Sequence, residues 1–176
     1  RMVLCELHTS EARIIAREFE GDRQVRIESG DGYQALRAWL PPRERRGLVH
    51  IDPAYERRDE RQRVLKALAE AHARWPTGIY ALWYPIQDQA TADDFRRRLQ
   101  RLGIPRMLAV ELRVLADEAF RLNGSGLILI NPPWRLDSTL EQTLPWLWET
   151  LSHRAEGGWR VTWLTGEAPA GPARPA

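Results

Sequence analysis

The residues best suited to chemistry are Asp52, Pro53 and Tyr55, which directly follow an apolar stretch at positions 48–51. The Asp52 carboxylate and the Pro53 carbonyl can each accept one N–H from a planar amino group, which draws the nitrogen lone pair out of conjugation. Proline fixes its own φ and favours an extended residue before it, so both acceptors keep a set orientation. The Tyr55 ring offers a flat face for stacking. These groups suit a flat base with an exocyclic amine; the alternative is a strand that ends in a local Asp-Pro turn.

The position of these residues in the predicted fold supports the chemical interpretation. The stretch 48–51 is short, mostly apolar and partly β-branched, which predicts a strand buried within a sheet. In an open α/β sheet, ligands bind beyond the carboxyl ends of the strands. Asp52 is therefore expected at the end of the sheet where a substrate would bind.

Periodicity predicts strands that alternate with helices along the chain. The alternation predicts a doubly wound α/β sheet that ends in antiparallel strands. Thr9 or Ser10 is expected to cap the first helix, and Thr91 the fourth. The predicted strands cover about 2–7, 25–28, 48–51, 79–84, 106–115, 126–131 and 159–164, and the predicted helices about 11–19, 33–40, 59–74, 91–102 and 136–153.

Five motifs occur in one order along residues 1–166. The stretch 52–55 (Asp-Pro-Ala-Tyr) resembles the D/N-P-P-Y/F/W motif of S-adenosylmethionine-dependent amino methyltransferases. Around it stand Glu-Leu-His at 6–8, Gly-Asp-Gly at 30–32, Ala-Leu-Trp-Tyr-Pro at 81–85 and Asn-Pro-Pro-Trp at 131–134. Together they are similar to the RlmJ family of bacterial 23S ribosomal RNA adenine-N6 methyltransferases.

This resemblance implies a Rossmann-like methyltransferase fold, S-adenosylmethionine as cofactor and ribosomal RNA as partner. The implied reaction is methyl transfer to the N6 amino group of an adenine in 23S ribosomal RNA. Glu6 would bind the ribose hydroxyls of the cofactor, and Asp31 with Gly32 its adenine end. The implied catalytic residues are Asp52, Pro53 and Tyr55, with Asp52 also lining the cofactor site.

The sequence departs from the family pattern in two ways. Ala54 replaces the second proline of the motif, which relaxes the turn but leaves Asp52 and Tyr55 in place. The family also carries a first strand and a glycine-containing loop upstream of the ribose-binding acid, and neither precedes Glu6. We therefore expect the C-terminal part of a longer protein, with a gap in the sheet between the strands that end at Glu6 and Asp52. An unusual strand pairing, a second copy or a missing N-terminal fragment could close this gap.

Arginines and a second proline motif offer further candidate sites. Arg57 and Arg58 follow the central motif near the mouth of the predicted site, where RNA phosphates would pass; a solvated helix face is the alternative. The Asn-Pro-Pro-Trp motif at 131–134 is predicted to be a structural turn that walls the pocket. Cys5, Glu6 and His8 are too few and too close in sequence for a zinc site, so no metal is expected.

Composition limits the remaining possibilities. A chain of 176 residues with 43% hydrophobic content suits one domain, predicted over 1–166, followed by a Pro/Ala-rich tail at 167–176 that is predicted to be disordered. A net charge of +2 means that any attraction for polyanions must come from local patches. The only cysteine is Cys5, which suits a reducing cytoplasm, and no apolar run is long enough for a membrane span.

Other functions remain open from sequence alone. The chain could be an inactive fragment that binds RNA or supports assembly. It could also methylate DNA adenine or a protein glutamine, although Asp52 stands where glutamine methyltransferases usually carry Asn. Binding of S-adenosylhomocysteine would separate the active from the inactive alternatives.

Overall fold

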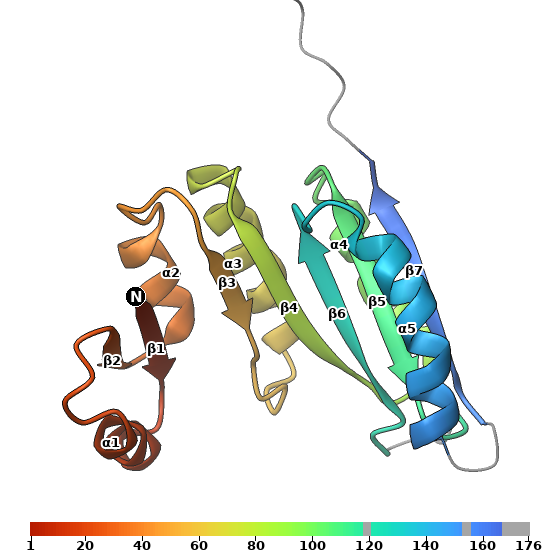
Figure 1. The fold of residues 1–176 in the computed structure, drawn as a ribbon, viewed down its shortest axis with the longest axis horizontal. Helices are drawn as coiled ribbons and strands as arrows, with labels where there is room; N and C mark the ends of the chain where they lie inside the picture. The colour runs from red at the N-terminus through yellow and green to blue at the C-terminus, as the bar shows by residue number, and fades with distance from the viewer. Residues whose placement is uncertain (118–120, 153–155, 167–176) are drawn as a thin grey trace, which may run out of the picture.

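The computed structural model describes residues 1–117, 121–152 and 156–166 (Figure 1). The tail predicted to be disordered lies outside these residues. The strands are β1 (Met2–Glu6), β2 (Val25–Ser29), β3 (Leu48–Ile51), β4 (Ile79–Ile86), β5 (Met107–Arg113), β6 (Gly124–Ile130) and β7 (Gly158–Thr165). The helices are α1 (Thr9–Glu18), α2 (Gly32–Trp39), α3 (Glu60–Arg74), α4 (Gln89–Gln100) and α5 (Leu136–Leu151).

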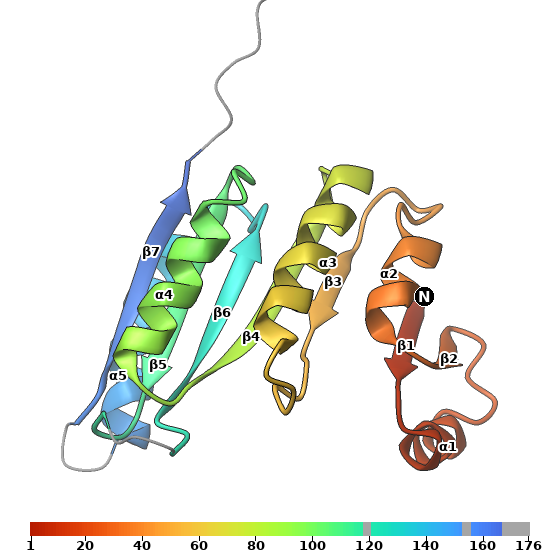
Figure 2. The same ribbon diagram turned by 180° about the vertical axis from the view of Figure 1, so that it is seen from behind.

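The strands form two separate sheets. The larger sheet has the order β3-β4-β6-β5-β7, in which β3 and β4 are parallel and the remaining neighbours are antiparallel. Helix α5 covers one face of this sheet, and α3 and α4 cover the other, as the two opposite views show (Figures 1 and 2). The α/β fold with antiparallel last strands, predicted from sequence, is confirmed.

The smaller sheet is formed by β1 and β2, which pair in parallel. In both views β1 lies between β2 and β3 (Figures 1 and 2), yet in the part of the chain that the structure describes β3 pairs with β4 and not with β1. Within the described residues, the edges of β1 and β3 that face each other therefore carry no strand pairing. The divided sheet matches the expected gap, and the expected alternative of direct pairing between β1 and β3 does not occur there.

The prediction that β3 is a strand buried within a sheet is wrong. Only Ile51 is buried; Leu48 is 63% exposed and His50 is also exposed. The reason is that β3 has a partner on one side only, so a strand with the apolar sequence of a central strand occupies an edge. His50 therefore lies at the surface and outside the core.

Two helix starts differ from the sequence prediction. The N-cap of α1 is His8, which makes no capping hydrogen bond through its side chain, and Thr9 already lies inside the helix. The N-cap of α4 is Asp88, whose Oδ1 accepts the backbone N–H of Thr91 at 2.7 Å. Carboxylate caps of this kind are as effective as the threonine that was expected.

The main core lies between the larger sheet and helices α3 and α4. Tyr80 and Leu82 of β4 pack there with Leu68 of α3 and with Phe95 and Leu99 of α4. These side chains are almost fully buried, and each contributes roughly 1.5–3 kcal/mol of burial free energy. Leu40, at the end of α2, is buried in the same core, and Leu36 of α2 packs against it, so apolar contacts also attach α2 to the larger sheet. Among the described residues, no helix is long and apolar enough to cross a bilayer.

Helices α2 and α3 connect the two sheets through a polar contact, which we call the interhelix contact (Asp31, Tyr33, Glu60 and Arg63). The Tyr33 hydroxyl donates a hydrogen bond of 2.6 Å to Oε1 of Glu60, which is only 7% exposed. Arg63 donates to Oδ2 of Asp31 at 2.8 Å, and its guanidinium lies 4.9 Å from the Tyr33 ring centre. Burial, and then Glu60, raise the pKa of the Tyr33 hydroxyl. The contact therefore depends on a protonated tyrosine that satisfies a buried carboxylate.

We predict that Tyr33→Phe loosens the two sheets from each other. The change leaves the buried Glu60 carboxylate without its hydroxyl donor, which costs about 1–3 kcal/mol. Faster hydrogen–deuterium exchange in β1, β2 and α2, with little change in β4 and β5, is the expected result.

Arg37→Gln provides the matched control for this variant. Arg37 also bridges α2 and α3, through a 2.6 Å ion pair with Glu70, but both side chains are substantially exposed. An exposed ion pair contributes less than about 1 kcal/mol. Equal exchange rates in the two variants would contradict the role given to Tyr33.

Candidate active site

Asp52 lies at the carboxyl end of β3, next to β4. Ile51 pairs with Leu82, so Asp52 and Trp83 come at the same level of the two parallel strands. Ile51 is buried whereas Asp52 is exposed, so the chain passes from core to solvent between these two residues. The carboxylate is accessible, as an acceptor for an incoming amine must be.

Tyr55 is fixed against the carboxyl end of β4. Its hydroxyl donates a hydrogen bond of 2.8 Å to the Trp83 carbonyl, and the two rings meet edge to face at 5.9 Å. The Tyr55 backbone has φ +55°, a left-handed conformation that few non-glycine residues adopt. Burial raises the pKa of Tyr55, and Asp52 raises it further against an opposing effect of Arg61. The ring is thus held rigidly, and Asp52 is near enough to influence its charge.

Glu6 and Asp31 occupy the carboxyl ends of β1 and β2 in the smaller sheet. Oε1 of Glu6 accepts the His8 N–H at 2.8 Å, and the Glu6 carbonyl accepts the Gly30 N–H at 2.9 Å. Asp31 caps α2, because its Oδ1 accepts the Tyr33 N–H at 2.8 Å while Oδ2 binds Arg63. Gly32 begins α2.

These groups are compatible with an adenosine ligand, though not equally. An ionised carboxylate has about four acceptor positions. Glu6 uses one of them in the bond to His8, so two ribose hydroxyls could be accommodated. Asp31 already serves the α2 backbone and Arg63, which leaves it less capacity. The first helical N–H groups, such as that of Gly32, have no partner within the helix and can bind a ligand acceptor.

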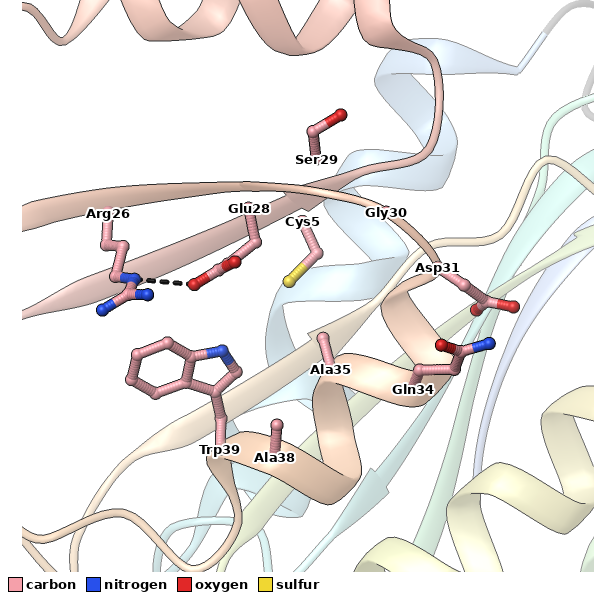
Figure 3. Close-up of a pocket in the computed structure, with 10 residues that line it drawn as sticks. All are labelled: Cys5, Arg26, Glu28, Ser29, Gly30, Asp31, Gln34, Ala35, Ala38 and Trp39. Atoms are coloured by element: carbon pink, nitrogen blue, oxygen red, sulfur yellow. Dashed lines mark hydrogen bonds and ion pairs between the residues drawn. The ribbon is translucent and has the colours of Figure 1, made fainter.

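One hollow lies between the smaller sheet and α2 (Figure 3). Its volume is about 470 Å³, and Asp31 lines it whereas Glu6 and Asp52 do not. Figure 3 shows the Trp39 ring of α2 beside the ion pair of Arg26 and Glu28, and the Arg26 guanidinium lies 4.8 Å from the ring centre. The hollow therefore lies between the smaller sheet and α2, and it does not join the three carboxylates into one cavity.

The second hollow lies beside Tyr55, between the segment after β3 and the start of α4. Its volume is about 210 Å³, and its lining includes Arg57, Arg58 and Arg61 together with Thr91. The structure thus brings the two arginines predicted for RNA binding next to the ring predicted for base stacking. Arg61, which follows the motif in the same arginine-rich stretch, also lines this hollow.

The Asn-Pro-Pro-Trp motif lies away from this site. Because β6 runs antiparallel to β4, Asn131 lies beside the amino end of β4, whereas Asp52 lies beside the second half of that strand. The Asn131 side chain donates hydrogen bonds of 2.8 Å to the carbonyls of Pro76 and Gly78. The motif is a structural turn that holds the connection between α3 and β4, and the expectation that it walls the pocket is wrong.

The described residues contain no group of three or more histidine, cysteine or acidic side chains placed to hold a metal ion.

The interhelix contact is a feature that sequence reasoning missed. Glu60 and Arg63 are three residues apart and so share a helix face, which was a detectable signal. Their partners, Tyr33 and Asp31, could be identified only after α2 and α3 were placed side by side.

Comparison with known proteins relates this arrangement to ribosomal RNA methyltransferases. The chain is 40% identical over 168 residues to ribosomal RNA large subunit methyltransferase J of Haemophilus influenzae, covering 95% of this chain and 60% of that protein. It is 42% identical over 165 residues to the Escherichia coli protein of the same name, covering 93% and 59%. The chain thus spans about three fifths of the length of these curated relatives.

A solved structure shows the same fold. The crystal structure of a protein from Legionella pneumophila str. Philadelphia 1 superposes with a TM-score of 0.80 at 31% identity, covering 92% of this chain and 59% of that one. The family model described as RsmJ, ribosomal RNA large subunit methyltransferase D, RlmJ, matches residues 1–165. The chain therefore belongs to this family of methyltransferases.

Proposed function

We propose that this chain carries the catalytic motif of an enzyme that methylates the N6 amino group of an adenine in 23S ribosomal RNA. The observation that carries the proposal is the pairing of an exposed carboxylate, Asp52, with a rigidly held aromatic ring, Tyr55, at the carboxyl ends of β3 and β4. Membership of a ribosomal RNA methyltransferase family supports the reaction type. Adenine as the base and N6 as the atom rest on the Asp-Pro-x-Tyr motif.

In this proposal the protein acts mainly by positioning the amine. A base inside a duplex cannot reach the site, so the adenine is unpaired or flipped out, and stacking on Tyr55 offsets part of that cost. The Asp52 carboxylate and the Pro53 carbonyl accept the two N6 hydrogens and so aim the nitrogen lone pair. As the new N–C bond forms, the nitrogen gains positive charge, and Asp52 takes up the proton that it releases.

S-adenosylmethionine, when bound, would supply the electrophilic methyl carbon, and its sulfur would keep the electron pair of the broken S–CH3 bond and leave as S-adenosylhomocysteine. Glu6 would hold its ribose hydroxyls, and Asp31 with the Gly32 backbone would lie at its adenine end. These residues belong to the smaller sheet and Asp52 to the larger one. The proposed site therefore bridges the two sheets, and the interhelix contact sets the distance between its halves.

The unpaired edges of β1 and β3 support a further strand between the two sheets. Such a strand would come from a segment outside these residues or from a second copy of the chain. Ribosomal RNA is the proposed partner, which corresponds to a location in the bacterial cytoplasm.

We predict that Asp52→Ala abolishes most methyl transfer in the complete protein. Loss of the acceptor that aims the amine should slow the reaction by about 10²–10⁴-fold. Calorimetry should show S-adenosylhomocysteine binding nearly unchanged, because Glu6 and Asp31 remain.

Asp94→Ala is the control for this experiment, since Asp94 is an exposed carboxylate on α4 that pairs with Arg98. Turnover of Asp52→Ala close to that of the control would refute the catalytic role. RNA binding by the unmodified protein without any heat from S-adenosylhomocysteine would instead favour an inactive RNA-binding module, the second candidate that the divided sheet allows.

We also predict different effects for two changes at Tyr55. Tyr55→Phe keeps the ring but loses the bond to the Trp83 carbonyl, so activity should fall by less than about tenfold. Tyr55→Ala removes the stacking platform, which is worth about 1–3 kcal/mol per base. Its KM for RNA should rise by roughly 5- to 150-fold, measured by steady-state kinetics. Equal KM values for the two variants would contradict base stacking on this ring.

A further inference from the structure

The hollow beside Tyr55 is strongly cationic. Arg57, Arg58 and Arg61 all line it, and none of the lining residues is acidic. Its volume of about 210 Å³ lies below the range of about 300–1,000 Å³ typical of small-molecule pockets. The space therefore suits a small anionic group better than a nucleobase or a whole cofactor.

The three arginines differ in how far nearby acids neutralise them. The Nε of Arg57 is bound to Asp59 at 3.1 Å, and both side chains are more than half exposed. Among the described residues, Arg58 makes no ion pair with an acid. The charge of Arg57 is thus largely neutralised by Asp59 within its own loop. Arg58 can bind an anionic ligand without first breaking an ion pair.

Arg61 is oriented by the protein but keeps its charge available. Its guanidinium lies 5.7 Å from the centre of the Phe95 ring, on the neighbouring helix. Asp88 caps α4 through Thr91; hydrogen bonds from Thr91, and then the charge of Arg61, lower the pKa of Asp88. The Asp88 carboxylate is already occupied by the helix end, so it offsets Arg61 only in part.

We propose that Arg58 and Arg61 bind one phosphate of the RNA, next to the nucleotide whose base stacks on Tyr55. The inference rests on the proposed function, and it assigns the phosphate to Arg58 and Arg61 instead of the pair Arg57 and Arg58. Guanidinium groups present paired N–H donors that match two phosphate oxygens. Because Tyr55 lines the same hollow, a base on its ring brings its own backbone to the two arginines.

The experiment measures RNA affinity against salt concentration. A labelled single-stranded RNA that contains unpaired adenines is titrated by fluorescence anisotropy at several salt concentrations. For single strands, each neutralised phosphate contributes a slope of about −0.7 to the plot of log affinity against log salt. The double variant Arg58→Ala/Arg61→Ala should therefore have a slope shallower by about 0.7 and bind roughly tenfold more weakly at 0.1 M salt.

Two further variants separate the specific site from general charge. Arg97→Ala/Arg98→Ala removes the same charge from the exposed side of α4, where both residues pair with Asp94, and should leave the slope unchanged. Arg57→Ala should have a smaller effect than either Arg58→Ala or Arg61→Ala. Circular dichroism of each variant establishes that it is folded.

The outcomes distinguish this inference from the proposed function. A slope for Arg58→Ala/Arg61→Ala equal to that of Arg97→Ala/Arg98→Ala overturns the phosphate site, even if methyl transfer proceeds. Suppose that Arg58→Ala/Arg61→Ala makes the salt slope shallower but the unmodified protein transfers no methyl group. This result supports the phosphate site and counts against the proposed function. No RNA binding by the unmodified chain, or equal competition by an acidic peptide of the same charge, also overturns the phosphate site.

Discussion

The hydrogen bond from Tyr33 to the buried carboxylate of Glu60 joins two sheets between which the described residues form no strand pairing. A buried carboxylate is costly without donors, so this bond and the adjacent Arg63 fix how α2 lies on α3, together with the packing of Leu36 and Leu40 against the main core. The arrangement matters for function because the proposed cofactor acids and the proposed catalytic carboxylate lie on different sheets. The geometry of the proposed active site therefore depends on three residues, Tyr33, Glu60 and Arg63, that have no proposed contact with RNA or cofactor.

The divided sheet also explains an unusual feature of β3. Its sequence is that of a central strand, yet Leu48 is exposed and only Ile51 is buried. An apolar strand with an unpaired edge is prone to pair with another strand. The same edge offers its unpaired backbone groups to a strand that would complete the sheet. Asp52 directly follows β3 and therefore lies next to this edge.

Much of this architecture could be predicted from the sequence. The apolar runs predict every strand of the larger sheet, and the residues that follow the run at 48–51 predict that Asp52 lies at the end of a strand. Local sequence could not show how β3 is exposed, because burial depends on a neighbouring strand that the run itself does not specify. Nor could it reveal the Tyr33–Glu60 bond, whose partners are 27 residues apart. The sequence shows several arginines after the motif. Only the fold shows that Arg57 forms an ion pair with Asp59 and that Arg61 lines the hollow.

The central claim is that this chain positions an adenine amine for methylation, and product analysis tests it most directly. Unmodified 23S ribosomal RNA and S-adenosylmethionine would be incubated with the chain alone, and with the chain fused to the part of the Escherichia coli relative that it does not cover. If the proposed function is right, mass spectrometry of the digested RNA will detect N6-methyladenosine from at least one of these proteins. Its absence from both, while the Escherichia coli relative forms it under the same conditions, would refute the proposed function.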